Sequence, residues 1–301
     1  MKKRTENKII NFVIIIVVAI IAAIYGENII NTEEKNIVIT EYDSKFSNIV
    51  LDNNLLQIFY FDVGQADSSL ILNNGKVMLI DAGNDKDGDT LVKNIKDLGI
   101  EKIDYLVGTH MHADHIGGMD SIVKSFEIGE IFIPYTTRPD VQVKELLQAI
   151  DEKGLTITAT DIGYSFKVGE GNCVIKHINN DEPTNINLSS IVIELEYKTS
   201  KYLFMGDAES KNENEINWNK VNVLKVGHHG SDTSSTKKFI NTVSPEIAII
   251  SVGKNNIYKL PKQTVIDRLE NIGAKIYRTD EDGTILITNN GTSNEVTKIK
   301  E

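Results

Sequence analysis

Short apolar runs rich in isoleucine and valine recur along the chain from Leu55 onward, separated by polar segments that contain turn residues. Runs of this length and composition predict β-strands. Between several of them apolar residues repeat at helical spacing, which predicts helices in residues 91–98, 143–150 and 261–273. Strands that are first paired and then interleaved with helices predict α/β layers around a mixed sheet, in one domain over residues 55–301. The predicted strands are residues 55–64, 68–74, 76–83, 104–110, 130–135, 190–197, 201–207, 223–229, 246–253 and 283–290.

The N-terminus has a different pattern. Residues 1–8 are rich in Lys and Arg, residues 9–25 are apolar apart from Asn11, and residues 26–54 are polar and read as a linker. The apolar run is at the short end of a membrane span, and the charges around it predict a cytoplasmic N-terminus with an extracellular domain. We therefore expect a single-pass location in the cell membrane. A cleaved signal peptide is the alternative, and it would export the same domain.

Composition narrows the function only slightly. The chain has 301 residues, 41% of them hydrophobic and 25% charged, as in ordinary globular proteins. Its net charge of −11 gives no general attraction for nucleic acid, although residues 220–301 hold 12 Lys and Arg against 9 Asp and Glu. The single cysteine, Cys173, excludes an internal disulfide and lies in a strand-like alternation that predicts burial. The sequence predicts no protein partner.

Candidate metal ligands follow four of the predicted strands. Asp81, His110, Asp207 and the pair His228–His229 each stand at the end of an apolar run. Ligand sites in α/β sheets form at the carboxyl ends of strands, where loops converge. Each of these residues alone has an ordinary explanation as a turn or surface residue, but four together favour a shared site.

The motif from His110 to His115, HMHADH, carries the chemistry of that site. In an extended segment His110 and His112 point the same way and can bind one ion, while Asp114 and His115 turn toward a second. Imidazole and carboxylate ligands suit zinc-like ions, and two such ions require a bridging carboxylate, for which Asp207 is the candidate. The sequence therefore predicts two divalent metal ions, zinc or manganese.

His-x-His-x-Asp-His after a short strand resembles the metallo-β-lactamase fold family. The phrases FDVGQADSSLI, LIDAG, LFMGDAE, LKVGHHGSDTSS, ISVGKNN and YRTDEDGTI, in this order, resemble the extracellular metallo-β-lactamase-like domain of the ComEC family of DNA-uptake channel proteins. The resemblance covers about residues 55–290. It implies an αββα sandwich, here preceded by one transmembrane helix, with a two-metal hydrolase site.

The resemblance also implies roles for individual residues. His110 and His112 would bind the first metal ion. Asp114, His115 and His228 would bind the second metal ion, and Asp207 would bridge the two. Asp114 would also orient the attacking water. Supporting roles fall on Asp62, Asp67, Asp81 and His229, although the sequence leaves open which of His228 and His229 is the ligand.

Two departures from the family patterns matter. Where many superfamily members have a third histidine for the first metal, this chain has NINLSSIVI, an Asn/Ser pattern that the ComEC-like group resembles. The first metal is thus short of a strong ligand, and the nearby His177 reads as structural. Secondly, Leu260 precedes Pro261 where the ComEC-like pattern has a histidine that could help to hold a phosphate, which weakens the transfer of nuclease activity.

The leading function is a phosphodiesterase or nuclease that acts on DNA through a two-metal activated water. The alternatives are a metallo-hydrolase of another substrate, such as a small phosphodiester, a lactone or a cell-wall component, and a membrane-tethered binding protein without catalysis. Candidate substrate-binding residues, chosen for their hydroxyl, amide or ammonium groups, are Asn187, Ser190, Ser231, Lys225 and Lys254.

Overall fold

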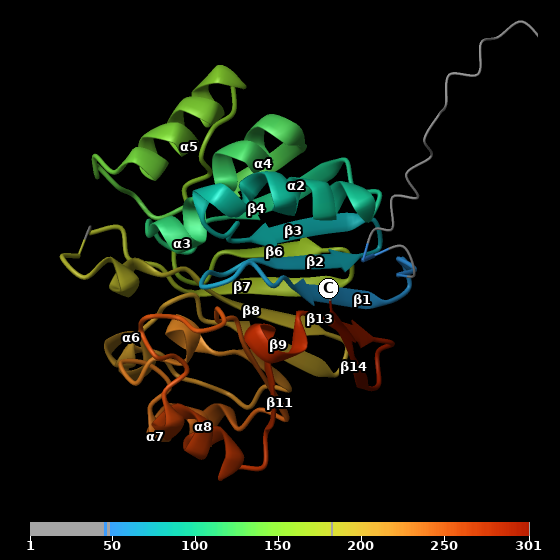
Figure 1. Cartoon of the computed structure of the whole chain (residues 1–301), viewed down its shortest axis with the longest axis vertical. Coiled ribbons are helices and arrows are strands. Elements are labelled where there is room, and N and C mark those ends of the chain that lie inside the picture. Colours follow the sequence, from blue (N-terminus) through green and yellow to red (C-terminus); the bar gives the residue numbers. More distant parts are fainter. Residues whose placement is uncertain (1–44, 47–48, 182, 301) are drawn as a thin grey trace, which may run out of the picture. The chain divides into compact units, whose positions relative to one another are not determined.

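The computed structural model describes residues 45–46, 49–181 and 183–300, all within the unit Ser44–Glu301. Two seven-stranded mixed sheets form the centre of this unit (Figure 1). In spatial order the first sheet contains β14 (Asn294–Ile299), β13 (Thr284–Asn289), β1 (Leu56–Tyr60), β2 (Ser69–Asn73), β3 (Lys76–Ile80), β4 (Lys102–Val107) and β5 (Glu127–Phe132). The second contains β12 (Lys275–Arg278), β11 (Ile247–Ile250), β10 (Val223–Lys225), β9 (Ser200–Phe204), β8 (Val192–Tyr197), β7 (Gly171–His177) and β6 (Ser165–Val168).

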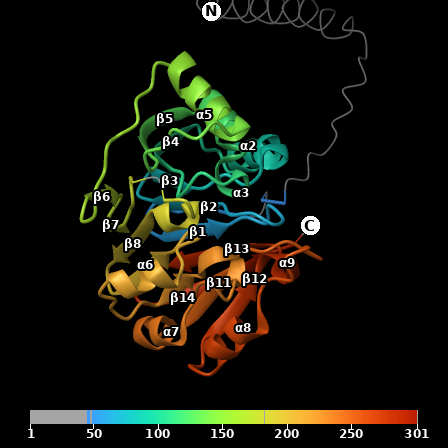
Figure 2. The ribbon, with the colours of Figure 1, turned by 90° about the vertical axis from the view of Figure 1, so that its left-hand side faces the viewer.

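Helices cover the outer face of each sheet (Figure 2). Those beside the first sheet are α2 (Gly88–Asp97), α3 (Ala113–Ile116), α4 (Met119–Ser125) and α5 (Val141–Glu152), with the 3-10 turn η1 (Asp85–Asp87). Those beside the second are α6 (Ser210–Glu215), α7 (Lys237–Val243) and α8 (Gln263–Glu270). The short elements η2 (Ile186–Ser189), η3 (Gly227–Gly230) and α9 (Thr279–Asp282) complete the described part of the chain. The predicted α/β layers are thus confirmed, with two mixed sheets.

Three hydrophobic cores hold the four layers together. One lies between the first sheet and its helices, one between the two sheets, and one behind the second sheet. Strand β1 shows how its sequence produces this arrangement: Ile58 and Tyr60 face the core between the sheets, while Phe59 faces the helices. Because both faces of the central strands are buried, these strands read as continuous apolar runs rather than as alternating ones.

The parallel part of each sheet positions the site. Strands β3, β4 and β5 are parallel, as are β9 to β12. Asp81 follows β3, His110 comes shortly after β4, Asp207 after β9 and His228 after β10. The carboxyl ends of both parallel sets therefore deliver polar side chains to one edge of the sandwich.

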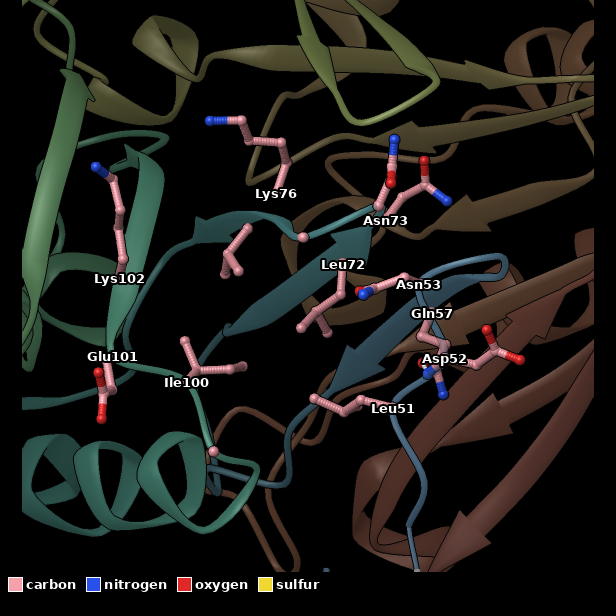
Figure 3. A pocket seen from close by; sticks show the side chains of 14 residues that line it. Leu51, Asp52, Asn53, Gln57, Leu72, Asn73, Lys76, Ile100, Glu101 and Lys102 are labelled. Atoms are coloured by element: carbon pink, nitrogen blue, oxygen red, sulfur yellow. Dashed lines mark hydrogen bonds between the residues drawn. The ribbon is translucent and has the colours of Figure 1, made fainter.

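A cavity of about 310 Å³ lies at the other end of the first sheet (Figure 3). Its lining includes Lys76 and Lys102, the first residues of β3 and β4, and the preceding Glu101. Because it opens at the amino ends of strands whose carboxyl ends lead to Asp81 and His110, it is separate from the candidate metal centre.

The predicted location in the cell membrane is corrected by the structure. In residues 45–46, 49–181 and 183–300, no helix has both the length and the apolar character needed to cross a membrane. Residues 1–8 and 9–25 lie outside the described residues, as does most of the predicted linker over 26–54. The last part of that linker packs on the domain, where Phe46 is buried against Phe59 and Phe61.

Candidate metal centre

Four candidate ligand atoms, three of them buried, converge at what we name the second metal position. Asp207 Oδ1 lies 3.2 Å from His115 Nε2 and 3.7 Å from His229 Nε2, and His229 Nε2 lies 3.3 Å from Asp114 Oδ2. The Nε2 atoms of both histidines and Oδ1 of Asp207 are buried without a hydrogen-bond partner. Ligand atoms around a tetrahedral zinc-like ion are separated by about 3.3 Å. Orphaned buried polar atoms at this spacing fit a divalent cation.

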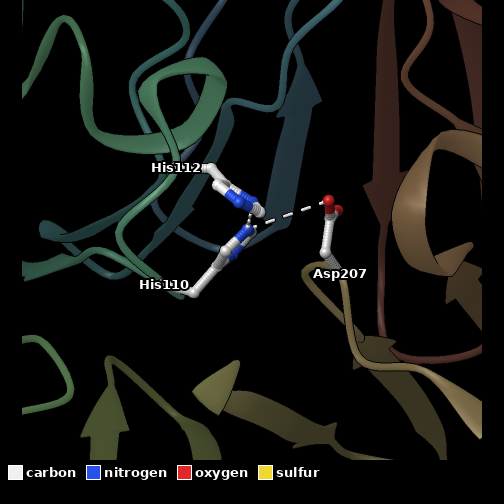
Figure 4. A group of neighbouring side chains, drawn as sticks. All are labelled: His110, His112 and Asp207. Atoms are coloured by element: carbon white, nitrogen blue, oxygen red, sulfur yellow. Dashed lines mark hydrogen bonds and ion pairs between the residues drawn. The ribbon is translucent and has the colours of Figure 1, made fainter. Parts of the chain in front are cut away.

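A second group of atoms forms the first metal position (Figure 4). His110 Nε2 lies 2.9 Å from His112 Nδ1 and 3.8 Å from Asp207 Oδ2. The two oxygens of Asp207 therefore face different positions, as a bridging carboxylate must. His110 is fully buried and His112 is half-buried, so the first position is open to solvent on the His112 side.

The adjacent histidines 228 and 229 take different directions because both have left-handed backbone dihedrals, with φ of 51° and 53°. His229 is buried and completes the second position. His228 is partly exposed; its Nε2 lies 3.7 Å from Asp207 Oδ2, and its Nδ1 lies 2.9 Å from Thr233 Oγ1. Left-handed non-glycine residues are strained and cluster at functional sites. The geometry places His229, which the sequence analysis assigned to a supporting role, among the atoms of the second position.

Asp81 supports the histidine loop from beneath. Its Oδ1 accepts a hydrogen bond from Thr109 N at 2.7 Å, and its Oδ2 lies 2.8 Å from both Thr109 Oγ1 and His115 Nδ1. An Nδ1–H donated to a carboxylate leaves the Nε2 lone pair of His115 directed at the metal position. Gly117 allows the loop to pass close by, since a Cβ there would lie 2.3 Å from Asp85 N.

A buried ion pair lies under His229. Lys225 Nζ is 2.6 Å from Asp67 Oδ2, and Asp67 Oδ1 is 3.3 Å from His229 Nδ1, which also lies 3.0 Å from Ser251 O. Only 2% of the Lys225 side chain is exposed. Lys225 was predicted to bind substrate; this is corrected, because its ammonium group is enclosed and neutralises Asp67 instead.

We expect Lys225→Met to lower the free energy of unfolding by about 3–5 kcal/mol, because it leaves the Asp67 carboxylate buried without its cation. Urea denaturation followed by circular dichroism measures this change. Lys237→Met, at an exposed position in α7, is the matched control and should stay within about 0.5 kcal/mol. A loss below about 1 kcal/mol in Lys225→Met would contradict a structural role for the pair.

The remaining predicted residues surround Asp207 and His228. Ser190 Oγ accepts a hydrogen bond from Asp207 N, and Asn187 donates one from Nδ2 to Glu209 Oε1. Ser231 is buried in the turn after His229, with its Oγ 3.1 Å from Thr233 Oγ1. These three side chains hold the site together, whereas Lys254 is exposed. Asp62 accepts a hydrogen bond from Gly64 N.

Two residues beside the metal centre were not predicted from the sequence, and one histidine is excluded as a metal ligand. Glu209 accepts hydrogen bonds from Asn185 and Asn187 and lies 3.6 Å from His228 Nδ1; its place directly after the Gly-Asp-Ala turn was the available signal. The other residue is Thr233, whose Oγ1 lies 2.9 Å from His228 Nδ1. His177 is buried, with Nδ1 2.9 Å from Ser190 O and Nε2 3.0 Å from Asn212 Nδ2, so neither nitrogen is left for a metal.

Burial and neighbouring charge set the protonation of the metal-free site. Burial lowers the pKa of His110 well below its usual value, and the charge of His115 lowers it further. Burial also opposes protonation of His229, but the carboxylates of Asp207 and Asp67 outweigh it and raise the pKa of His229 to about 10. The pKa of His115 is raised for the same kind of reason, chiefly by Asp207 and Asp81 against burial. Protons therefore occupy the second position when metal does not.

Metal affinity at the second position should consequently rise with pH. A solution pH of 6–8 is below the pKa of His229, which is about 10, so His229 carries a proton that a metal ion must displace. Each displaced proton makes the affinity rise by up to about tenfold per pH unit. Chelator-buffered zinc titrations of the metal-free protein at pH 6, 7 and 8 measure this slope. An affinity that is independent of pH would contradict the protonated state.

Comparisons with known proteins show the family of the chain. The model of the metallo-beta-lactamase superfamily matches residues 61–254. The chain is similar to ComE operon protein 3 of Bacillus subtilis, with 34% identity over 192 residues that cover 62% of this chain and 25% of that protein. It is also similar to Recombination protein 2 of Haemophilus influenzae, with 29% identity over 238 residues that cover 77% of this chain and 28% of that protein. The matches thus span about a quarter of the length of these relatives.

Among solved structures, CmlA, a diiron beta-hydroxylase from Streptomyces venezuelae, has a TM-score of 0.52 and 14% identity to this chain, with 74% of this chain and 52% of that chain covered. At this identity the likeness shows the fold alone.

Proposed function

The chain belongs to the metallo-beta-lactamase superfamily, and from this premise we propose that it is a metal-dependent phosphodiesterase that acts on DNA. The observation that carries the proposal is the pair of ligand groups that share Asp207: His110 and His112 face one of its oxygens, while His115 and His229 face the other. When bound, two divalent ions would lower the pKa of a water molecule and offset the charge of a phosphate group.

The residues of the chain have separate tasks in this proposal. Asp207 holds the two positions at a fixed separation, because Ser190 fixes its backbone. Asp114 is the most exposed carboxylate among the ligand atoms of the second position, with 31% of its side chain accessible. It is therefore within reach of solvent and can accept a hydrogen bond from the attacking water, which directs the lone pair of that water toward phosphorus.

Two observations favour DNA as the substrate. The relatives include proteins named for recombination and for competence, among them Competence protein ComA of Neisseria gonorrhoeae at 30% identity. Residues 220–301, which supply His228 and His229, also have a positive balance of charge in a chain whose net charge is −11. Phosphate contacts by lysine would make the binding sensitive to salt.

A substrate panel tests the proposal. The full chain, loaded with zinc or manganese, is given single-stranded DNA, double-stranded DNA, bis(p-nitrophenyl) phosphate and a lactone. Hydrolysis of DNA and of the small phosphodiester, lost in Asp207→Asn, is expected. Turnover of the lactone alone would replace the proposal with a different hydrolase. Two bound ions without turnover of any phosphodiester would favour a binding protein.

A further inference from the structure

Residues 254–261 lie in the connection between β11 and α8, and the residues on both sides of them contact the metal centre or the segments beside it. At its start, Ser251 O lies 3.0 Å from His229 Nδ1, and Gly253 N donates a hydrogen bond to Gln65 Oε1 at 3.1 Å. At its end, Lys262 N donates to Gly230 O at 2.9 Å. His229, a candidate ligand of the second position, and Gly230 after it thus contact the residues that flank the segment 254–261, which we name the 254–261 loop.

Internal hydrogen bonds give the 254–261 loop one defined conformation. Asn256 Nδ2 donates to Gly253 O at 3.0 Å and to Leu260 O at 2.8 Å, and Asn256 Oδ1 accepts from Leu260 N at 2.9 Å. Lys262 Nζ also donates to Tyr258 O at 2.9 Å. The side chain of Asn256 thus closes the loop across its base and fixes the residues between.

The residues fixed at the tip are apolar and exposed. Ile257 is 86% exposed and Tyr258 is 60% exposed, whereas few other large hydrophobic residues in the described part of the chain are accessible to this degree. Lys254 and Lys259 flank them and are exposed as well, and the sequence GKNNIYKLPK contains no acidic residue. A positive, aromatic tip therefore stands beside the metal centre of an acidic chain.

We propose that the 254–261 loop binds a single-stranded segment of the nucleic-acid substrate, with a base stacked on Tyr258 and phosphates bound by Lys254 and Lys259. Sequence-tolerant binders of single strands combine aromatic platforms with cationic side chains in this manner. Because Asn256 already orders the loop, binding does not have to fix its conformation, which favours affinity. This inference rests on the proposed phosphodiesterase function.

The test measures binding rather than turnover. The metal-loaded full chain is titrated with a fluorescent phosphorothioate strand of about twelve nucleotides, which resists hydrolysis, and anisotropy gives the dissociation constant. Tyr258→Leu should weaken binding by roughly 5- to 150-fold, because one base–aromatic stack contributes about 1–3 kcal/mol. Tyr258→Phe keeps the ring and should remain within about twofold of the wild type.

Salt dependence tests the lysines separately. Lys254→Ala combined with Lys259→Ala should reduce the slope of log affinity against log salt by about 1.4, since each phosphate contact with a single strand contributes about 0.7. Lys102→Ala, an exposed lysine at the cavity of Figure 3, is the matched control and should leave the slope unchanged.

Three results would overturn the inference: unchanged affinity in Tyr258→Leu, equal losses in the Leu and Phe variants, or an unchanged salt slope in the double lysine variant. Hydrolysis of bis(p-nitrophenyl) phosphate by the wild type is measured in parallel. It distinguishes a failure of the loop inference from a failure of the proposed phosphodiesterase function. Turnover with loop-independent strand binding would refute only the role of the loop, whereas loop-dependent binding without turnover would refute the phosphodiesterase.

Discussion

Asp114→Ala is expected to abolish hydrolysis while the domain remains folded. The substitution removes one of the four ligand atoms of the second position and the carboxylate that orients the water. Loss of a residue that merely supports a metal ligand commonly costs 10- to 100-fold in affinity or activity. Removal of a ligand with a second task should therefore lower kcat/KM by more than about 10²-fold. Initial rates with bis(p-nitrophenyl) phosphate at saturating zinc or manganese measure the change.

The fold should tolerate this substitution, because the Asp114 side chain is partly exposed and its truncation removes little packing. Unfolding midpoints and far-ultraviolet circular dichroism of the variant check that point. Asp120→Ala serves as the matched control. Asp120 lies on α4, five residues after His115 in the sequence, and its carboxylate pairs with Lys124, so this variant should keep most of the activity. Wild-type rates in Asp114→Ala would refute the two-metal interpretation.

We expect the two metal positions to differ in their affinity for a metal ion. The second position offers two imidazoles and two carboxylates, a full set for a zinc-like ion. The first has His110, His112 and the shared Asp207. His228 Nε2 lies 3.7 Å from the same oxygen of Asp207 but outside this group of mutually close ligand atoms, and His177 is occupied by hydrogen bonds elsewhere. Purified protein should therefore retain about one tightly bound ion and regain activity when a second is added, with manganese competing best at the first position.

Matched histidine variants assign the tight ion to its position. His229→Ala should lose it, with affinity reduced by more than about 100-fold, whereas His112→Ala should keep about one ion per chain. His228→Ala should also keep it, because His228 Nε2 faces the other oxygen of Asp207. Chelator titration with elemental analysis at each step provides the measurement. Two ions of equal affinity in the wild type, or retention of the tight ion in His229→Ala, would contradict the assignment.

The central strands were predictable from the sequence because both of their faces are buried. Strand β1 directs Phe59 into one core and Ile58 into another, so its apolar run is continuous and easy to recognise. The edge strands β12 and β14 were not predicted, because their side chains are largely half-buried or exposed and lack an apolar run. The histidine motif was equally visible, since its ligands are neighbours in sequence.

Residue patterns were sufficient to predict the α/β class, and the family resemblance carried by the sequence motifs led to the superfamily. The metal-ligand roles that this resemblance implies stay predictions. Only the tertiary structure shows which of these side chains contact one another. The left-handed backbone at His228 and His229 directs two adjacent rings to different oxygens of Asp207, a choice that depends on dihedral angles and not on residue type. Lys225 reads as a free cation in sequence but lies buried against Asp67, 158 residues away along the chain. The pairing of distant residues follows from the packing of the two sheets, because local sequence patterns specify strands and turns but not which strand ends come together.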